Sequence, residues 1–60
     1  MRTRIKRPLN NSVTELLERT RDALEREGKH RNAVAITKRV MGCECEREAR
    51  RLIGLVVDID

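Results

Sequence analysis

The chain has 60 residues, of which 38% are hydrophobic and 40% are charged, and its formal net charge is +4. A chain of this length forms one domain and buries only about 60% of the surface that its unfolded form exposes. It contains no Phe, Tyr or Trp to fill a core with few side chains. These properties exclude a large independent core, and they favour stabilisation by a second copy in a homodimer.

The sequence predicts a cytoplasmic protein that does not enter a membrane. Its longest apolar stretch, residues 52–57 if Gly54 is counted, is far shorter than the roughly 20 residues that span a bilayer. The basic residues near the N-terminus are not followed by the apolar region of a secretory signal. The only cysteines, Cys43 and Cys45, are two residues apart, so a disulfide between them would close too small a loop to stabilise the fold.

Residues 1–11 are predicted to form a basic extended arm, followed by a single small helical domain over residues 12–60. The arm contains no acid, and its four bases equal the whole net charge: Arg2, Arg4, Lys6 and Arg7. In an extended chain, alternate side chains share a face, so Arg2, Arg4 and Lys6 would project together. Pro8 and the asparagines that follow predict a turn before the first helix.

The first helix is expected at about residues 12–27. Ser12 and Glu15 have the spacing of a capping box, in which each side chain satisfies a free backbone N–H. Apolar positions from Val13 to Leu24 recur at helical spacing and predict a core-facing stripe. Gly28 supplies the left-handed residue that ends many helices.

The second helix is expected at about residues 32–41, with Asn32 as its N-cap. The helical period divides it into two faces. The face predicted to enter the core comprises Ala33, Val34, Ile36, Thr37, Val40 and Met41. The opposite face is cationic and comprises Arg31, Asn32, Ala35, Lys38 and Arg39.

The third helix is expected at about residues 44–57, because Glu44 and Glu46 suit the positive end of a helix dipole. Its core stripe begins at Cys45 and continues through Ala49, Leu52, Ile53 and Val56. The β-branched residues at 56–59 leave open a short strand instead of a last helical turn. The fold class is therefore mainly all-α, with three short helices after an arm that can pair as a β-ribbon in a dimer.

Metal binding and catalysis find little support in the sequence. Cys43, Cys45 and His30 lack the second pair of ligands that a structural zinc site needs. With one histidine, so short a chain offers little from which to build the nucleophile and general base that nucleophilic catalysis needs. No glycine-rich phosphate-binding loop is present either. We predict no enzyme activity, no metal and no cofactor.

Basic residues in the arm and second helix predict contact with nucleic acid. Between Gly28 and Gly42 there are four bases and no acid, and each base can neutralise a phosphate. The candidate residues are Arg2, Arg4, Lys6, Arg7, Lys29, Arg31, Asn32, Lys38 and Arg39. Without aromatic residues to stack on bases, duplex DNA is a better ligand than a single strand. The alternative is an adaptor or inhibitor whose cationic helix face binds an acidic protein.

An extended basic arm, a capped helix, the segment Gly28–Asn32 and a helix containing Ile36 and residues 39–41 resemble the ribbon-helix-helix repressors. The resemblance covers residues 2–41. It implies a dimeric DNA-binding transcriptional regulator whose paired arms enter the major groove. Arg2, Arg4 and Lys6 would then face bases, while Lys29, Arg31 and the backbone near Asn32 would hold phosphates. The third helix and Pro8 depart from that pattern.

Residues 28–53 also resemble the helix-turn-helix of the C-terminal domain of the bacterial ribosomal stalk protein. Gly28-Lys29, Ala33-Val34, Gly42 and Glu48-Ala49 carry this likeness, which needs a one-residue insertion after Gly42. It implies a protein-binding module. An ordinary DNA-binding helix-turn-helix is disfavoured, because its recognition helix would open with glutamates that phosphates repel.

Overall fold

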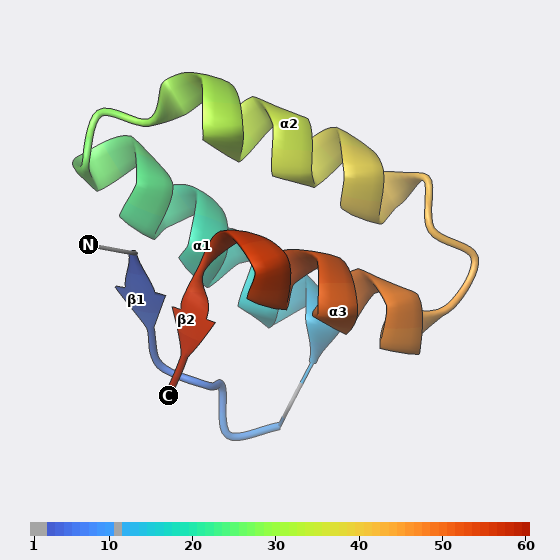
Figure 1. Ribbon diagram of the computed structural model, residues 1–60. Helices are drawn as coiled ribbons and strands as arrows, with labels where there is room; N and C mark the ends of the chain where they lie inside the picture. The colour runs from blue at the N-terminus through green and yellow to red at the C-terminus, as the bar shows by residue number, and fades with distance from the viewer. Residues whose placement is uncertain (1–2, 11) are drawn as a thin grey trace.

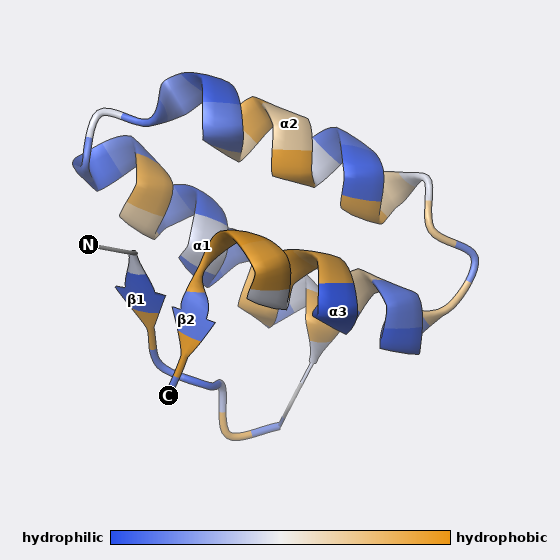
Figure 2. Ribbon diagram, in the orientation of Figure 1, coloured by the Kyte–Doolittle hydropathy of each residue, from blue (hydrophilic) through white to orange (hydrophobic). Residues whose placement is uncertain are grey.

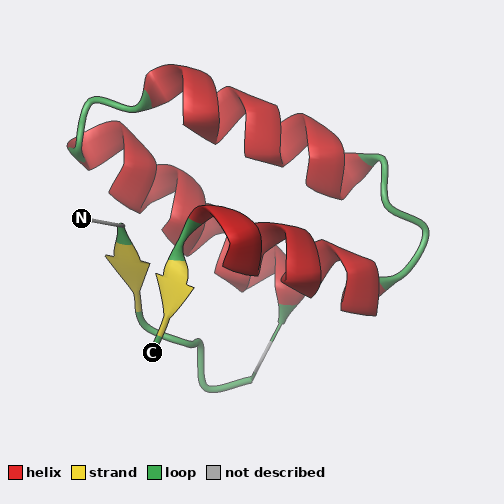
Figure 3. Ribbon diagram, in the orientation of Figure 1, coloured by secondary structure: helices red, strands yellow, loops and turns green. Residues whose placement is uncertain are grey.

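A computed structural model of the chain describes residues 3–10 and 12–60. The element order is β1 (Arg4–Ile5), α1 (Val13–Arg26), α2 (His30–Met41), α3 (Glu46–Val56) and β2 (Asp58–Ile59). The helices pack against one another and the two strands lie together at one side of them (Figure 1, Figure 3). The predicted fold of three helices is confirmed, and a short parallel sheet is added to it.

The first helix begins where the sequence predicts. Ser12 is the extended N-cap residue of α1, and its carbonyl accepts a hydrogen bond from the N–H of Leu16 at 2.9 Å. The expected capping box is absent, because no side chain of the cap makes the hydrogen bond. Instead, the Ser12 N–H donates to the side-chain oxygen Oδ1 of Asn10 at 3.1 Å. The turn preceding the helix is thus fixed by Asn10.

The second helix begins earlier than predicted. Lys29, not Asn32, is the N-cap residue of α2, and Asn32 is its third residue. Gly28 has a φ of 75°, and the Lys29 N–H donates to the carbonyl of Leu24 at 2.8 Å. This tight left-handed turn reverses the direction of the chain within two residues. His30 therefore already has helical geometry, and the loop that Asn32 was predicted to close with an N-cap does not exist.

Among the described residues, nine hydrophobic side chains are buried in the core, and every helix contributes to it: Ile5, Leu16, Leu24, Ala33, Ile36, Val40, Ala49, Ile53 and Val57. Figure 2 shows hydrophobic and hydrophilic segments alternating along each helix, as amphipathic helices require. The buried stripe of α2 is narrower than predicted. Val34 is 40% exposed and Met41 is 78% exposed, because both lie at the edge of the predicted face.

Cys45 is exposed, so its predicted place in the core stripe of the third helix is wrong. It is the extended N-cap residue of α3 and therefore precedes the helical periodicity on which that prediction depended. Cys43, which is half-buried, packs against the core instead. Its thiol donates to the carbonyl of Arg39 at 3.2 Å, so the thiol caps the end of α2.

The arm forms a strand that pairs with the other end of the same chain. β1 and β2 are parallel, with Arg4 opposite Asp58 and Ile5 opposite Ile59. The side chains of Thr3 and Ile5 are buried on the inner face of this segment, while Arg4 and Lys6 are exposed. The strand alternative for residues 56–59 is correct for Asp58–Ile59, although α3 continues to Val56. Pairing between the arms of two copies stays a prediction and would have to use the other edge of β1.

Two glycines should respond to alanine in opposite directions. Gly54 lies inside α3 with open space around its Cα, so Gly54→Ala should stabilise the protein by about 1 kcal/mol. Gly28 also has open space but a φ of 75°, so Gly28→Ala should cost about 1 kcal/mol in backbone strain alone. Urea unfolding followed by circular dichroism measures both changes. Equal signs for the two variants would contradict these helix and turn assignments.

Candidate nucleic-acid interface

The outward face of α2 carries three exposed bases. Arg31, Lys38 and Arg39 project from a helix that contains no acidic residue, and Asn32 is exposed on the same side. Lys38 and Arg39 lie in the last turn, where positive charge stabilises the negative end of the helix dipole. Arg31 and Lys38 are separated by about two helical turns, which corresponds to roughly 10 Å along the axis. The face therefore presents a row of positive charge along most of the helix.

None of these three bases is neutralised within the described parts of the chain. The ion pairs found there join Asp22 to Arg26, Glu27 to Lys29, Glu25 to His30 and Glu46 to Arg50. Arg31, Lys38 and Arg39 belong to none of these pairs, and their side chains make no hydrogen bond with a described residue. Their charge is thus available to an external anion.

A shallow groove of about 330 Å³ runs beside this face, between α2 and α3. Its α2 side is formed by Asn32, Ala35, Ile36 and Arg39, and its α3 side by Leu55 and Val56. The Leu55 side chain is 67% exposed. The groove places an apolar contact surface directly beside the charge of Arg39.

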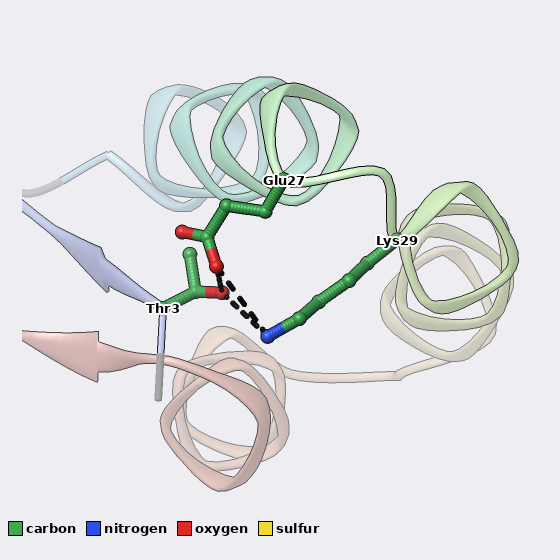
Figure 4. A network of polar contacts seen from close by, with 3 residues as sticks. All are labelled: Thr3, Glu27 and Lys29. Atoms are coloured by element: carbon green, nitrogen blue, oxygen red, sulfur yellow. Dashed lines mark hydrogen bonds and ion pairs between the residues drawn. The ribbon is translucent and has the colours of Figure 1, made fainter. Parts of the chain in front are cut away.

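Lys29, a predicted phosphate ligand, is engaged inside the protein instead. Its Nζ donates to Thr3 Oγ1 at 3.1 Å and lies 3.4 Å from Glu27 Oε1. Thr3 Oγ1 in turn donates to Glu27 Oε1 at 2.9 Å. Figure 4 shows the three side chains converging from the residue before β1, the end of α1 and the turn that follows it. This arrangement attaches the N-terminal segment to the helices and leaves Lys29 little freedom to reach a phosphate.

The bases of the arm lie away from α2. Arg4, Lys6 and Arg7 are exposed, but β1 and α2 make no contact with each other. Figures 1 and 4 both place the strands on the far side of the helices from α2. Arg2 lies outside the described residues. The two basic elements predicted from the sequence therefore form separate surfaces.

A second groove, of about 350 Å³, was not predicted from the sequence. It lies between β1 and one flank of α1, and four of the described bases line it: Arg4, Lys6, Arg19 and Arg26. Arg19 and Arg26 are seven residues apart on α1, a spacing that places them on one flank. That spacing was visible in the sequence, but nothing in the sequence indicated that β1 would lie beside them.

Other kinds of site find no support in the described residues. No group of three His, Cys, Asp or Glu side chains there could hold a metal ion, and Cys43 and Cys45 are both free thiols. None of the helices described combines the length and the hydropathy needed to cross a bilayer.

Comparisons with protein-family models, with curated proteins and with solved structures found no match to this chain. Neither the ribbon-helix-helix resemblance nor the stalk-protein resemblance is tested by them. Inferences about function therefore depend on the surfaces of the protein itself.

Proposed function

We propose that this protein is a small regulator that binds duplex DNA through the exposed face of α2. The observation that carries the proposal is the set of bases on that face, Arg31, Lys38 and Arg39, without an acid on the helix or an ion-pair partner in the described chain. Bases that bind phosphates release condensed counterions, which supplies the main driving force for binding to duplexes. Asn32 adds a side-chain amide that can donate to a phosphate oxygen.

The neighbouring elements support α2, rather than α3, as the contacting helix. The first turn of α3 carries Glu46 and Glu48, which phosphates repel. α2 has 12 residues, or about 18 Å of helix, and the major groove is about 12 Å wide and admits one helix. The chain also lacks the aromatic residues on which single-stranded bases stack.

The proposal includes a homodimer in the cytoplasm. Three phosphate contacts from one helix give only weak, salt-sensitive binding, and two copies would double their number. A core of small aliphatic residues in a chain of this size also favours association with a second copy. The two free thiols fit a reducing compartment.

Replacing Arg31, Lys38 and Arg39 together by Ala should remove most of the affinity for duplex DNA. Because log K depends on log salt with a slope of about −0.9 per phosphate contact, the slope should become shallower by about 3. Fluorescence anisotropy with a labelled duplex over a salt series measures both quantities. A matched control replaces Arg21, Arg47 and Arg51, which are exposed bases on the other two helices, by Ala.

The control removes the same amount of positive charge. If both triple variants lost affinity equally, the effect would be long-range electrostatics, and this result would contradict a defined site on α2. Failure to bind any duplex at low salt would contradict the proposal entirely. The ribbon-helix-helix resemblance makes a different prediction, because there the arm faces the bases. Ala at Arg2, Arg4 and Lys6 should remove most of the affinity if that resemblance holds, and much less if α2 is the site.

A further inference from the structure

The outer edge of β1 has backbone groups that β2 does not use. Towards β2, the Thr3 carbonyl accepts from the Asp58 N–H at 2.8 Å, and the Ile5 carbonyl accepts from the Asp60 N–H at 2.9 Å. In a parallel pair, alternate residues bond to opposite sides. The N–H and C=O of Arg4 and Lys6 therefore point to the outer edge. Among the described residues, Lys6 O accepts there only a 3.5 Å bond from the Arg19 guanidinium.

This edge opens onto the groove between β1 and α1. Ala23 lies at the groove with Arg19 and Arg26 on either side of it along the helix, and its small side chain leaves space above α1. Ile5 is the inward-facing residue of β1 and is buried. A strand added beside β1 would continue the sheet over this flank of α1, with one of its side chains directed towards Ala23.

The charges around the groove are predominantly positive. The two acids that line it are already paired: Asp22 lies 3.2 Å from Arg26, and Glu27 contacts Thr3 and Lys29. Arg4, Lys6 and Arg19 have no acidic partner among the described residues. The side chains of Arg4 and Lys6 stand on the solvent face of the strand, where residues directly opposite on a neighbouring strand would contact them.

We propose that the outer edge of β1 binds an extended acidic peptide segment of a partner protein as a third strand. Main-chain hydrogen bonds to Arg4 and Lys6 would supply part of the affinity, as in other cases of strand addition. Acidic side chains opposite Arg4 and Lys6 would supply the specificity, and a small apolar side chain between them would pack on Ala23. This surface is distinct from the face of α2, so the failure of one proposal would not contradict the other.

The charge distribution disfavours the other obvious occupants. A second copy of β1 would place Arg4 and Lys6 beside the same bases, and like charges directly opposite each other destabilise a strand pair. Lysine and arginine on an edge are also the usual protection against pairing with identical chains. The phosphates of a nucleic acid could bind the positive charges, but a nucleic acid has no backbone amides to form the main-chain hydrogen bonds of an added strand.

The test uses a labelled synthetic peptide of alternating glutamate and valine, titrated into the whole chain. The protein is short enough to be made by chemical synthesis, so the backbone nitrogen of Arg4 can be methylated with its side chain unchanged. Because that nitrogen points away from β2, the fold should persist, while the peptide should bind at least about tenfold more weakly. The matched control methylates the nitrogen of Leu9, which lies in an exposed turn and should leave binding unchanged.

Three further measurements complete the test. On binding, the Arg4 and Lys6 amides should become protected from hydrogen exchange, and a peptide of alternating lysine and valine should not bind. Arg4→Ala with Lys6→Ala should weaken binding about tenfold, because two cross-strand charge pairs are lost. Unchanged affinity after methylation at Arg4, protection of these amides by duplex DNA alone, or their protection in a self-associated dimer would each overturn the proposal.

Discussion

Replacing Ile53 by Ala is expected to lower the free energy of unfolding by about 2–5 kcal/mol, the usual cost of deleting a buried aliphatic side chain. Ile53 is 0% exposed, and it lies in α3, which packs against both other helices and β2. The cost is large because a 60-residue chain is stabilised by only about 3–9 kcal/mol in total. Urea unfolding followed by circular dichroism at a fixed protein concentration gives the change.

Leu55→Ala is the matched control for this prediction. Leu55 lies in the same helix, but its side chain is 67% exposed, so the change should stay within about 0.5 kcal/mol. If Leu55→Ala cost as much as Ile53→Ala, Leu55 would have to be buried in solution by another molecule. Repeating the measurement at several protein concentrations would then reveal a dimer that covers it.

Replacing Thr3 by Val is expected to cost about 1–3 kcal/mol, although the two side chains have nearly the same shape. Thr3 is 1% exposed, and its hydroxyl both donates to Glu27 and accepts from Lys29. Valine would leave both charged partners without this bond in a partly buried position. Because Thr3 immediately precedes β1, faster hydrogen exchange at the Asp58 and Asp60 amides should accompany the loss of stability.

Thr20→Val provides a control at equal burial. Thr20 is 0% exposed, but its hydroxyl donates to the carbonyl of Leu16 within the same helix, a carbonyl that the helix already satisfies. The cost should therefore be well below that of Thr3→Val. Similar losses for both variants would mean that the contact between Thr3, Glu27 and Lys29 contributes nothing specific to the fold.

The helices were predictable because cap residues and hydrophobic spacing within each segment indicate where a helix lies. Ser12 and Gly28 mark the ends of α1, and the spacing of Ala33, Ile36 and Val40 identifies the buried face of α2. The start of α2 was not predictable from residue preferences. It depends on the turn closed by Gly28 and Lys29, which begins the next helix at His30 before a favourable cap residue is reached.

The sheet was beyond prediction from local patterns. An extended arm and a short strand within residues 56–59 could be predicted, but each strand has only two residues, and nothing local indicates that the two pair in parallel across the whole length of the described chain. The burial of Thr3 follows from that pairing. The position of Arg19 beside the arm follows from it as well, and so does the groove that both help to form.

The candidate site was predicted in part. The helical period correctly places Arg31, Lys38 and Arg39 on an exposed face of α2. It could not show that Lys29 contacts Thr3 and Glu27, because that contact depends on where the arm packs. For the same reason, charge counts along the chain could not separate the arm from α2 in space.

The parallel pairing of β1 with β2 also has a consequence for the order of folding. Ile5 and Ile59 are 54 residues apart in the sequence and lie opposite each other in the sheet. Bringing them together in the unfolded chain would cost loop-closure entropy, whereas packing of the three intervening helices brings the two strands close. We therefore expect the sheet to form last, as the step that completes the native state. A partner that recognises the edge of β1 would thereby distinguish the fully folded chain from every earlier intermediate.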